Sequence, residues 1–119
     1  MHDQLCSVYF LIDISLAPTV PTAPELSCAT STSLKLSWTC SRKESVPISG
    51  FKIKINGHNK TSFSLADSKT EFIVLNDLEP KTMYFAQISA INLHGSSNYS
   101  TPSKDHCTLS GNLVKLPMY

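Results

Sequence analysis

The chain has 119 residues, with 10 Lys and Arg against 9 Asp and Glu, a formal net charge of +1 and a hydrophobic content of 41%. This length suits one domain, and a near-neutral balance with a single Arg argues against a nucleic-acid partner and against a polybasic membrane anchor. The sequence contains 28 Ser and Thr residues, a usage that favours strands and turns and therefore predicts an all-β fold.

The first 17 residues differ in character from the rest of the chain. The longest uninterrupted apolar run, Val8–Ile12, is far shorter than the roughly 20 residues of a membrane-spanning helix, so we expect no membrane insertion by this chain. Residues 5–17 resemble a signal peptide with a cleavage site, but Asp13 interrupts the apolar run and no basic residue precedes it. We expect residues 1–17 to derive from a preceding domain or an alternative start, with a cleaved signal as the alternative.

A proline-rich stretch over residues 18–25 is expected to be extended and to lead into the first strand. Strict alternation of apolar residues over Leu34–Trp38 and over Phe51–Ile55 predicts two strands, each with one buried face. Because no amphipathic helix is available to cover them, the sequence predicts two sheets packed face to face. Further strands are expected at 26–29, 62–66, 71–75, 83–92 and 101–109, with turns at 46–50, Asn56-Gly57 and 94–96. The tail over residues 110–119 shows no assignable pattern.

Several motifs in this order are similar to those of the fibronectin type III family. They are Leu26-x-Cys28, Leu34-x-Leu36-Ser37-Trp38, Pro47-Ile48-x-Gly50-Phe51-x-Ile53, Leu78-x-Pro80-x-Thr82-x-Tyr84 and Ala90-x-Asn92-x-x-Gly95. The resemblance covers residues 18–109 and implies an immunoglobulin-like β-sandwich of seven antiparallel strands in two sheets. It also implies a buried Trp38 and a tyrosine corner formed by Leu78, Pro80 and Tyr84, in which the Tyr84 hydroxyl bonds to the backbone near Leu78.

The four cysteines, at positions 6, 28, 40 and 107, form no C-x-x-C motif, so zinc-ribbon and redox patterns are absent. We expect reduced thiols. On the first strand of the resembled fold, Cys28 is expected to be a small buried hydrophobe. A disulfide between Cys28 and Cys107 is the alternative.

No catalytic motif accompanies the four histidines, and His106 and Cys107 would face opposite sides of a strand. We therefore expect no catalytic residue, no metal site, no cofactor and no small-molecule substrate. Two glycosylation sequons, at Asn59 and Asn98, would be used only in a secreted chain. We favour an intracellular location, with an extracellular or cell-surface location as the alternative.

The resemblance implies a non-catalytic protein-interaction or spacer module, and the alternative is a fragment of a secreted or cell-surface adhesion protein or receptor. The family register would point Tyr84, Ala86, Ile88 and Ala90 inward and their neighbours to solvent. The candidate binding face, for an adjacent module or another protein, therefore consists of Lys52, Lys54, Phe85, Gln87 and Ile91. Alternatively, the lysine stems cover Phe85. Candidate binding loops contain Arg42, Lys43, Glu44, Leu93 and His94.

Overall fold

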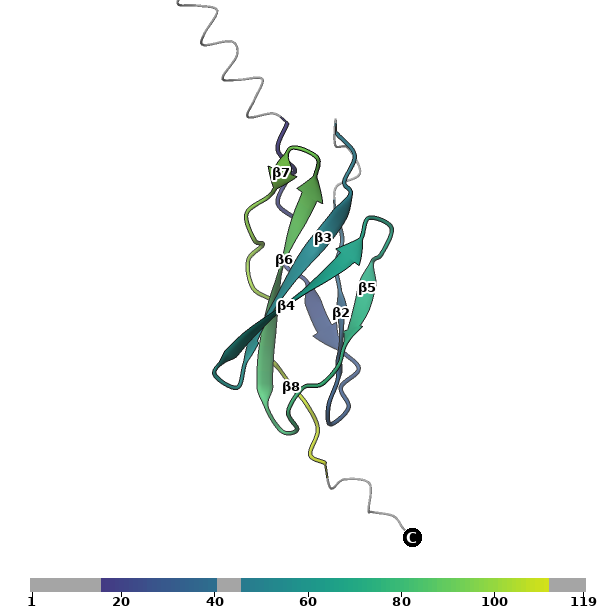
Figure 1. Ribbon diagram of the computed structural model, residues 1–119. Helices are drawn as coiled ribbons and strands as arrows, with labels where there is room; N and C mark the ends of the chain where they lie inside the picture. The colour runs from purple at the N-terminus through teal and green to yellow at the C-terminus, as the bar shows by residue number, and fades with distance from the viewer. Residues whose placement is uncertain (1–15, 41–45, 112–119) are drawn as a thin grey trace, which may run out of the picture.

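Two antiparallel sheets face each other in the computed structural model, which describes residues 16–40 and 46–111 (Figure 1). The first sheet has the strand order β1-β2-β5; the second has the order β4-β3-β6-β7, and β8 also pairs with β6. No helix long and apolar enough to cross a membrane occurs in the described part. The strands are β1 (Glu25–Ser27), β2 (Leu34–Ser37), β3 (Gly50–Gly57), β4 (Lys60–Asp67), β5 (Phe72–Leu75), β6 (Met83–Asn92), β7 (Gly95–Ser96) and β8 (His106–Cys107). The predicted all-β sandwich is confirmed.

The core lies between the two sheets and is built from the alternating apolar positions. The innermost side chains come from β2, β3 and β6, and they include Leu34, Leu36, Ile53, Ala86, Ile88 and Ala90, all fully buried. Trp38 directly follows β2 and packs edge to face on Phe51, with 5.4 Å between the ring centroids. The expected burial of Trp38 is confirmed, but its indole Nε1 has no hydrogen-bond partner among the described residues.

The tyrosine corner also forms as the resemblance implies. The backbone N–H of Glu79 donates to the Tyr84 hydroxyl oxygen at 2.8 Å. The N–H of Leu78 donates to the Thr32 carbonyl at 3.0 Å, which ties the corner to the loop before β2. These two bonds fix the crossing of the chain from the first sheet to the second, because they satisfy polar groups at the point where the strand ladder is interrupted.

The hairpin between β3 and β4 turns two residues later than predicted. His58 and Asn59 occupy the turn, with φ of 51° and 58°, the pair of left-handed residues that a type I′ turn requires. Asn56 and Gly57, the expected turn residues, belong to β3, and the Thr61 hydroxyl donates to the Asn56 side-chain oxygen at 2.8 Å. The prediction located the hairpin correctly but assigned the wrong turn residues.

The last expected strand, over residues 101–109, is reduced to the two residues of β8, while β7 lies at Gly95–Ser96, where a turn was expected. The described residues therefore contain eight strand segments where seven strands were predicted. Between β7 and β8, three serines spaced three residues apart replace the regular ladder. The N–H groups of Ser97, Ser100 and Ser103 each donate to a β6 carbonyl at 2.8 Å. Their hydroxyl oxygens accept hydrogen bonds from the backbone N–H groups of the same β6 residues, at 2.9 to 3.1 Å.

The described chain starts at one end of the sandwich and finishes at the other (Figure 1). Near its start, the Asn92 side-chain amide donates to the Leu16 carbonyl at 3.0 Å, so the fold makes a contact two residues before the expected boundary at residue 18. The expectations for the N-terminal segment up to residue 15 and for the tail from residue 112 lie outside the described residues.

Candidate functional site

The outer face of the second sheet carries the residues predicted to bind a partner. In the register, Lys54 lies opposite Gln87 and Lys52 opposite Ser89, which confirms that these side chains share one face. However, Phe85 and Ile91 are half-buried and not exposed as expected. The exposed apolar residues of this face belong to the edge strand β4, which lies on the other side of β3 from β6.

Those residues are Phe63 and Leu65 of the edge strand β4, with exposed fractions of 62% and 72%. Phe63 lies opposite Lys54 and Leu65 opposite Lys52 across the β3–β4 pairing. We refer to Lys52, Lys54, Phe63 and Leu65 as the Phe63 face. The sequence predicts a strand over residues 62–66, but the alternation within it gives a weak signal, because the inward-pointing residues there are small and include two serines.

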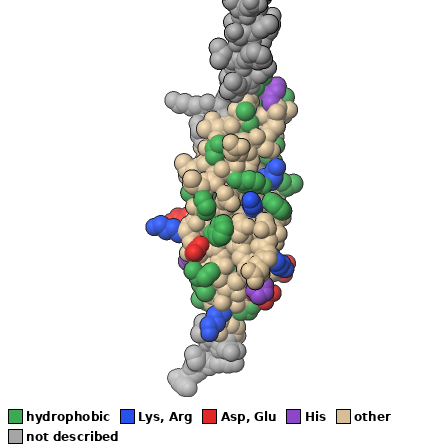
Figure 2. Space-filling model, turned by 90° about the vertical axis from the view of Figure 1, so that its left-hand side faces the viewer, with side chains coloured by type: hydrophobic (Ala, Val, Ile, Leu, Met, Phe, Trp, Pro, Cys, Tyr) green, Lys and Arg blue, Asp and Glu red, His purple; other side chains and the backbone are tan. Residues whose placement is uncertain are grey.

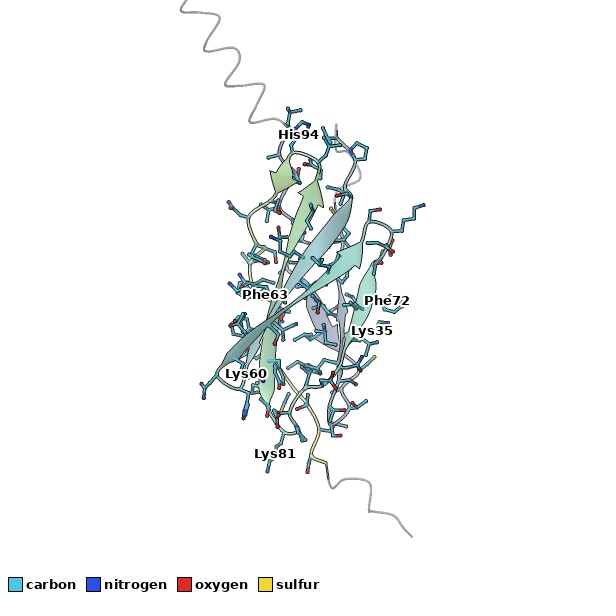
Figure 3. The ribbon with its side chains drawn as sticks, viewed as in Figure 1. Lys35, Lys60, Phe63, Phe72, Lys81 and His94 are labelled. Carbon is cyan, nitrogen blue, oxygen red and sulfur yellow. The ribbon has the colours of Figure 1, made fainter. Side chains whose placement is uncertain are left out.

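The position of Lys54 leaves the Phe63 ring uncovered. Its ammonium nitrogen lies 5.1 Å from the centroid of the Tyr99 ring, a distance at which a cation is attracted by the ring face. The alternative in which lysine stems cover Phe85 stays a prediction. Seen from the side on which Phe63 projects in Figure 3, basic side chains lie among hydrophobic ones (Figure 2).

The outer face of the first sheet offers a useful contrast. Phe72 and Val74 of β5 are exposed by 53% and 49%, but the Lys35 ammonium nitrogen lies 4.4 Å from the centroid of the Phe72 ring. Phe63 and Phe72 project from opposite sides of the sandwich (Figure 3). A cation thus covers the aromatic ring of the first sheet, whereas the Phe63 ring lacks such a contact among the described residues.

Two loops were also predicted to bind. Leu93 and His94 form the two-residue loop between β6 and β7, and Leu93 is 81% exposed. The Asn92 side-chain oxygen accepts a hydrogen bond from the His94 N–H at 2.8 Å, which shapes this loop. The second loop, which contains Arg42, Lys43 and Glu44, lies outside the described residues.

Cys28 is exposed, and the expectation of a buried Cys28 is wrong. The strand β1 ends at Ser27, and Cys28 has a φ of 49°. This left-handed conformation turns the Cys28 side chain away from the face on which Leu26 is buried. The alternation of faces that predicted its burial therefore ends at Ser27, one residue before Cys28. Cys107 is likewise exposed, and both thiols are free.

A groove of about 680 Å³ runs between β1 and residues 102–106. Its wall contains the Trp38 ring together with four ionisable residues, Glu25, Lys104, Asp105 and His106. Within residues 16–40 and 46–111, His, Cys, Asp and Glu side chains form no group of three that could hold a metal ion.

The two sequon asparagines are both exposed. Asn59 occupies the tip of the β3–β4 hairpin, and Asn98 lies in the segment between β7 and β8. The hydroxyl of Ser100, the third residue of the second sequon, is buried in the folded domain and accepts the Ile88 N–H. Glycan attachment at either site stays a prediction.

Comparisons with known proteins agree with this geometry. The family model of the fibronectin type III domain matches residues 19–106. A curated relative from Xenopus laevis, "Cell adhesion molecule-related/down-regulated by oncogenes", is 33% identical over 104 residues, which are 84% of this chain and 8% of that protein. This chain therefore spans a small part of the relative's length.

Solved structures share the fold. A structure titled "Myokine structure" has a TM-score of 0.67 and 25% identity, over 77% of this chain and 98% of that one. The chicken CNTN1 FN1–FN3 domains give a TM-score of 0.69 and 21% identity, over 78% of this chain and 31% of that one. With the tyrosine corner, the buried tryptophan and the two-sheet topology in place, the chain belongs to the fibronectin type III family, whose members serve as non-catalytic interaction or spacer modules.

Proposed function

We propose that this domain binds another protein through the Phe63 face, as one module of a longer adhesion-type protein. The observation that carries the proposal is the exposure of Phe63 and Leu65, at 62% and 72%, side by side on one face of β4. Covering large apolar side chains is favourable by about 25 cal/mol per Å² of area removed from water. A protein partner that covers both side chains would gain this free energy.

The composition of the Phe63 face indicates what such a partner would offer. Protein interfaces concentrate their binding free energy in a few apolar and aromatic residues, surrounded by polar groups that exclude water. Here Lys52 and Lys54 are half-buried directly beside the two apolar side chains. We therefore expect the partner surface to combine apolar groups with carboxylates, because acidic groups would complement the two lysines.

An extracellular setting is the second part of the proposal. The Xenopus laevis relative carries a cell-adhesion name and is far longer than this chain. Both sequon asparagines are exposed, as glycan attachment requires. Start and finish of the described chain lie at opposite ends of the sandwich (Figure 1), an arrangement that suits a module placed in a row of others. The domain would act by binding and not by catalysis.

Site-specific photo-cross-linking tests the binding surface even while the partner is unidentified. A photoreactive phenylalanine analogue replaces Phe63 in the full chain, which is displayed on the surface of cells that express it naturally. The matched control carries the analogue at Phe72, which is similarly exposed but lies on the first sheet. A protein adduct from position 63 that is absent from position 72 supports the proposal. Equal adducts from both positions, or none from position 63, contradict it.

A further inference from the structure

The strand β4 is an open edge of the second sheet. It pairs with β3 over all eight of its residues and with no other strand in residues 16–40 and 46–111. In a two-residue hairpin, the residues that flank the turn form a hydrogen-bonded pair, and bonded and non-bonded pairs then alternate along the strands. Gly57 and Lys60 are the flanking pair here. The backbone groups that point away from β3 are therefore those of Thr61, Phe63, Leu65 and Asp67.

This edge lacks the protection that sheet edges usually have. Natural edge strands are kept from pairing by prolines, bulges, central charges or very short length. The eight residues of β4 contain no proline, and their one-to-one register with β3 contains no bulge. Its only charged residues, Lys60 and Asp67, lie at its two ends. By contrast, β1 and β5 have only three and four residues.

The sequence of β4 is complementary to itself in the antiparallel direction. The strand begins with a positive charge, Lys60, and ends with a negative one, Asp67. An antiparallel copy therefore places one positive and one negative residue at each end of the pairing, with the Lys60 side chain on the inner face of the sheet and the Asp67 side chain on the outer face. The Asp67 carboxylate also accepts hydrogen bonds from the Lys69 N–H at 3.0 Å and the Thr70 hydroxyl at 2.8 Å, which keep it fixed at the strand end.

The side chains select one register. A two-fold axis perpendicular to the sheet keeps each side chain on its own face, so Phe63 and Leu65 must pair with outward residues. An axis at Ser64 places Phe63 opposite Leu65 twice and Thr61 opposite Asp67 twice. An axis at Leu65 would oppose Phe63 to Asp67. An axis at Phe63 would oppose Leu65 to Thr61, which leaves the most exposed apolar side chain of β4 beside a hydroxyl.

We propose that a second copy of this chain pairs antiparallel along β4, with Ser64 on the two-fold axis, so that one continuous sheet crosses both copies. This inference goes beyond the proposed function, because it concerns the open edge of β4 and leaves the outer surface of the Phe63 face available to a different protein. Pairing of this kind supplies main-chain hydrogen bonds for affinity, while the side chains of alternate residues set the register. The Phe63 and Leu65 side chains of both copies then form a single apolar stripe on the outer face.

Disulfide trapping tests the register directly. In the proposed pairing, Ser64 faces Ser64 of the second copy in a non-hydrogen-bonded pair, where Cα atoms lie about 4.5 Å apart, a separation at which a disulfide can close. In full-length chain with all four native cysteines replaced by alanine, Ser64→Cys should give a covalent dimer under mild oxidation. The matched Ser62→Cys variant should give no covalent dimer, because residue 62 lies opposite Ala66 in this register. A dimer of Ser62→Cys without one of Ser64→Cys overturns the proposal.

Sedimentation velocity of the otherwise unmodified chain provides the second arm. Leu65→Lys introduces a charge at the centre of the edge and should weaken self-association by at least about tenfold. Val74→Lys is the control, because Val74 is an exposed residue of β5, an edge strand of the first sheet. This variant should associate like the parent. Circular dichroism verifies that both variants fold. A parent that stays monomeric at every concentration overturns the inference. The proposed function survives that result if position 63 still cross-links to a different protein.

Discussion

The ring of Tyr84 occupies the space where any side chain at position 57 would begin. A Cβ atom built on Gly57 would lie 2.3 Å from Cδ1 of Tyr84 and 2.7 Å from the carbonyl oxygen of Met83. Real Cβ atoms do not approach other atoms so closely, so this contact needs a glycine. The β3–β4 hairpin can therefore cross over the tyrosine corner only because residue 57 has no side chain.

Gly57→Ala should destabilise the domain by about 1–3 kcal/mol, the usual cost of forcing extra volume into a packed site. Urea denaturation monitored by tryptophan fluorescence measures the change. Gly111→Ala is the matched control, since a Cβ there would meet nothing within 4 Å. Equal stability of the two variants would show that Tyr84 moves aside without cost.

The sequence predicts the core of this fold well because alternation and the tyrosine corner are local signals. Leu34, Ile53 and Tyr84 are buried as expected, and each belongs to a run in which every second residue is apolar or to a motif of fixed spacing. Cys28 illustrates where such signals end. A single residue with a φ of 49° redirects its side chain, and nothing in its neighbours announces that conformation.

The candidate site was less predictable for a different reason. Which face of a strand remains exposed depends on its neighbours in the sheet, and β4 has a neighbour on one side only. Phe85 lies on a central strand and is half-buried there, whereas Phe63 at the edge is not. The choice between these two phenylalanines is made by strand order, which a pattern read along the chain does not contain.

Ser100→Ala should cost about 1–3 kcal/mol, because it leaves the buried N–H of Ile88 without its side-chain acceptor. Ser100 itself is 2% exposed, so water cannot readily replace the hydroxyl. Thermal unfolding of the variant against Ser96→Ala measures the effect, since Ser96 is exposed and its loss should matter within about 0.5 kcal/mol. Similar melting temperatures would mean that the serine hydroxyls are dispensable.

Cys28 and Cys107 should react rapidly with iodoacetamide in the native state, because both side chains are exposed. Cys40 is partly buried and packs against the core, so its alkylation should be slower. Mass spectrometry of peptides taken at successive times gives the three rates. A protected Cys28 would place this side chain back inside the sandwich and contradict the turn after β1.

The pKa of the Asp67 carboxyl lies below its usual value of 3.8, chiefly because the Thr70 hydroxyl donates to the carboxylate and also because the Lys69 N–H does. A lowered pKa in the folded state stabilises the domain above the unfolded-state pKa, and this contribution is lost as the pH falls through the folded-state pKa. Thr70→Val should raise the Asp67 pKa toward 3.8 and reduce the acid dependence of stability below that pH. Carboxyl NMR titration of the folded chain measures the shift. An unchanged pKa would assign the shift to other groups.

The serine-bonded segment over residues 97–103 determines how large an assembly of this domain can become. Because its hydroxyls and backbone are bonded to β6, a second molecule cannot add a strand directly to this side of β6. A pair formed about a two-fold axis along β4 would use the β4 edge of both molecules, so that edge could then recruit no third copy.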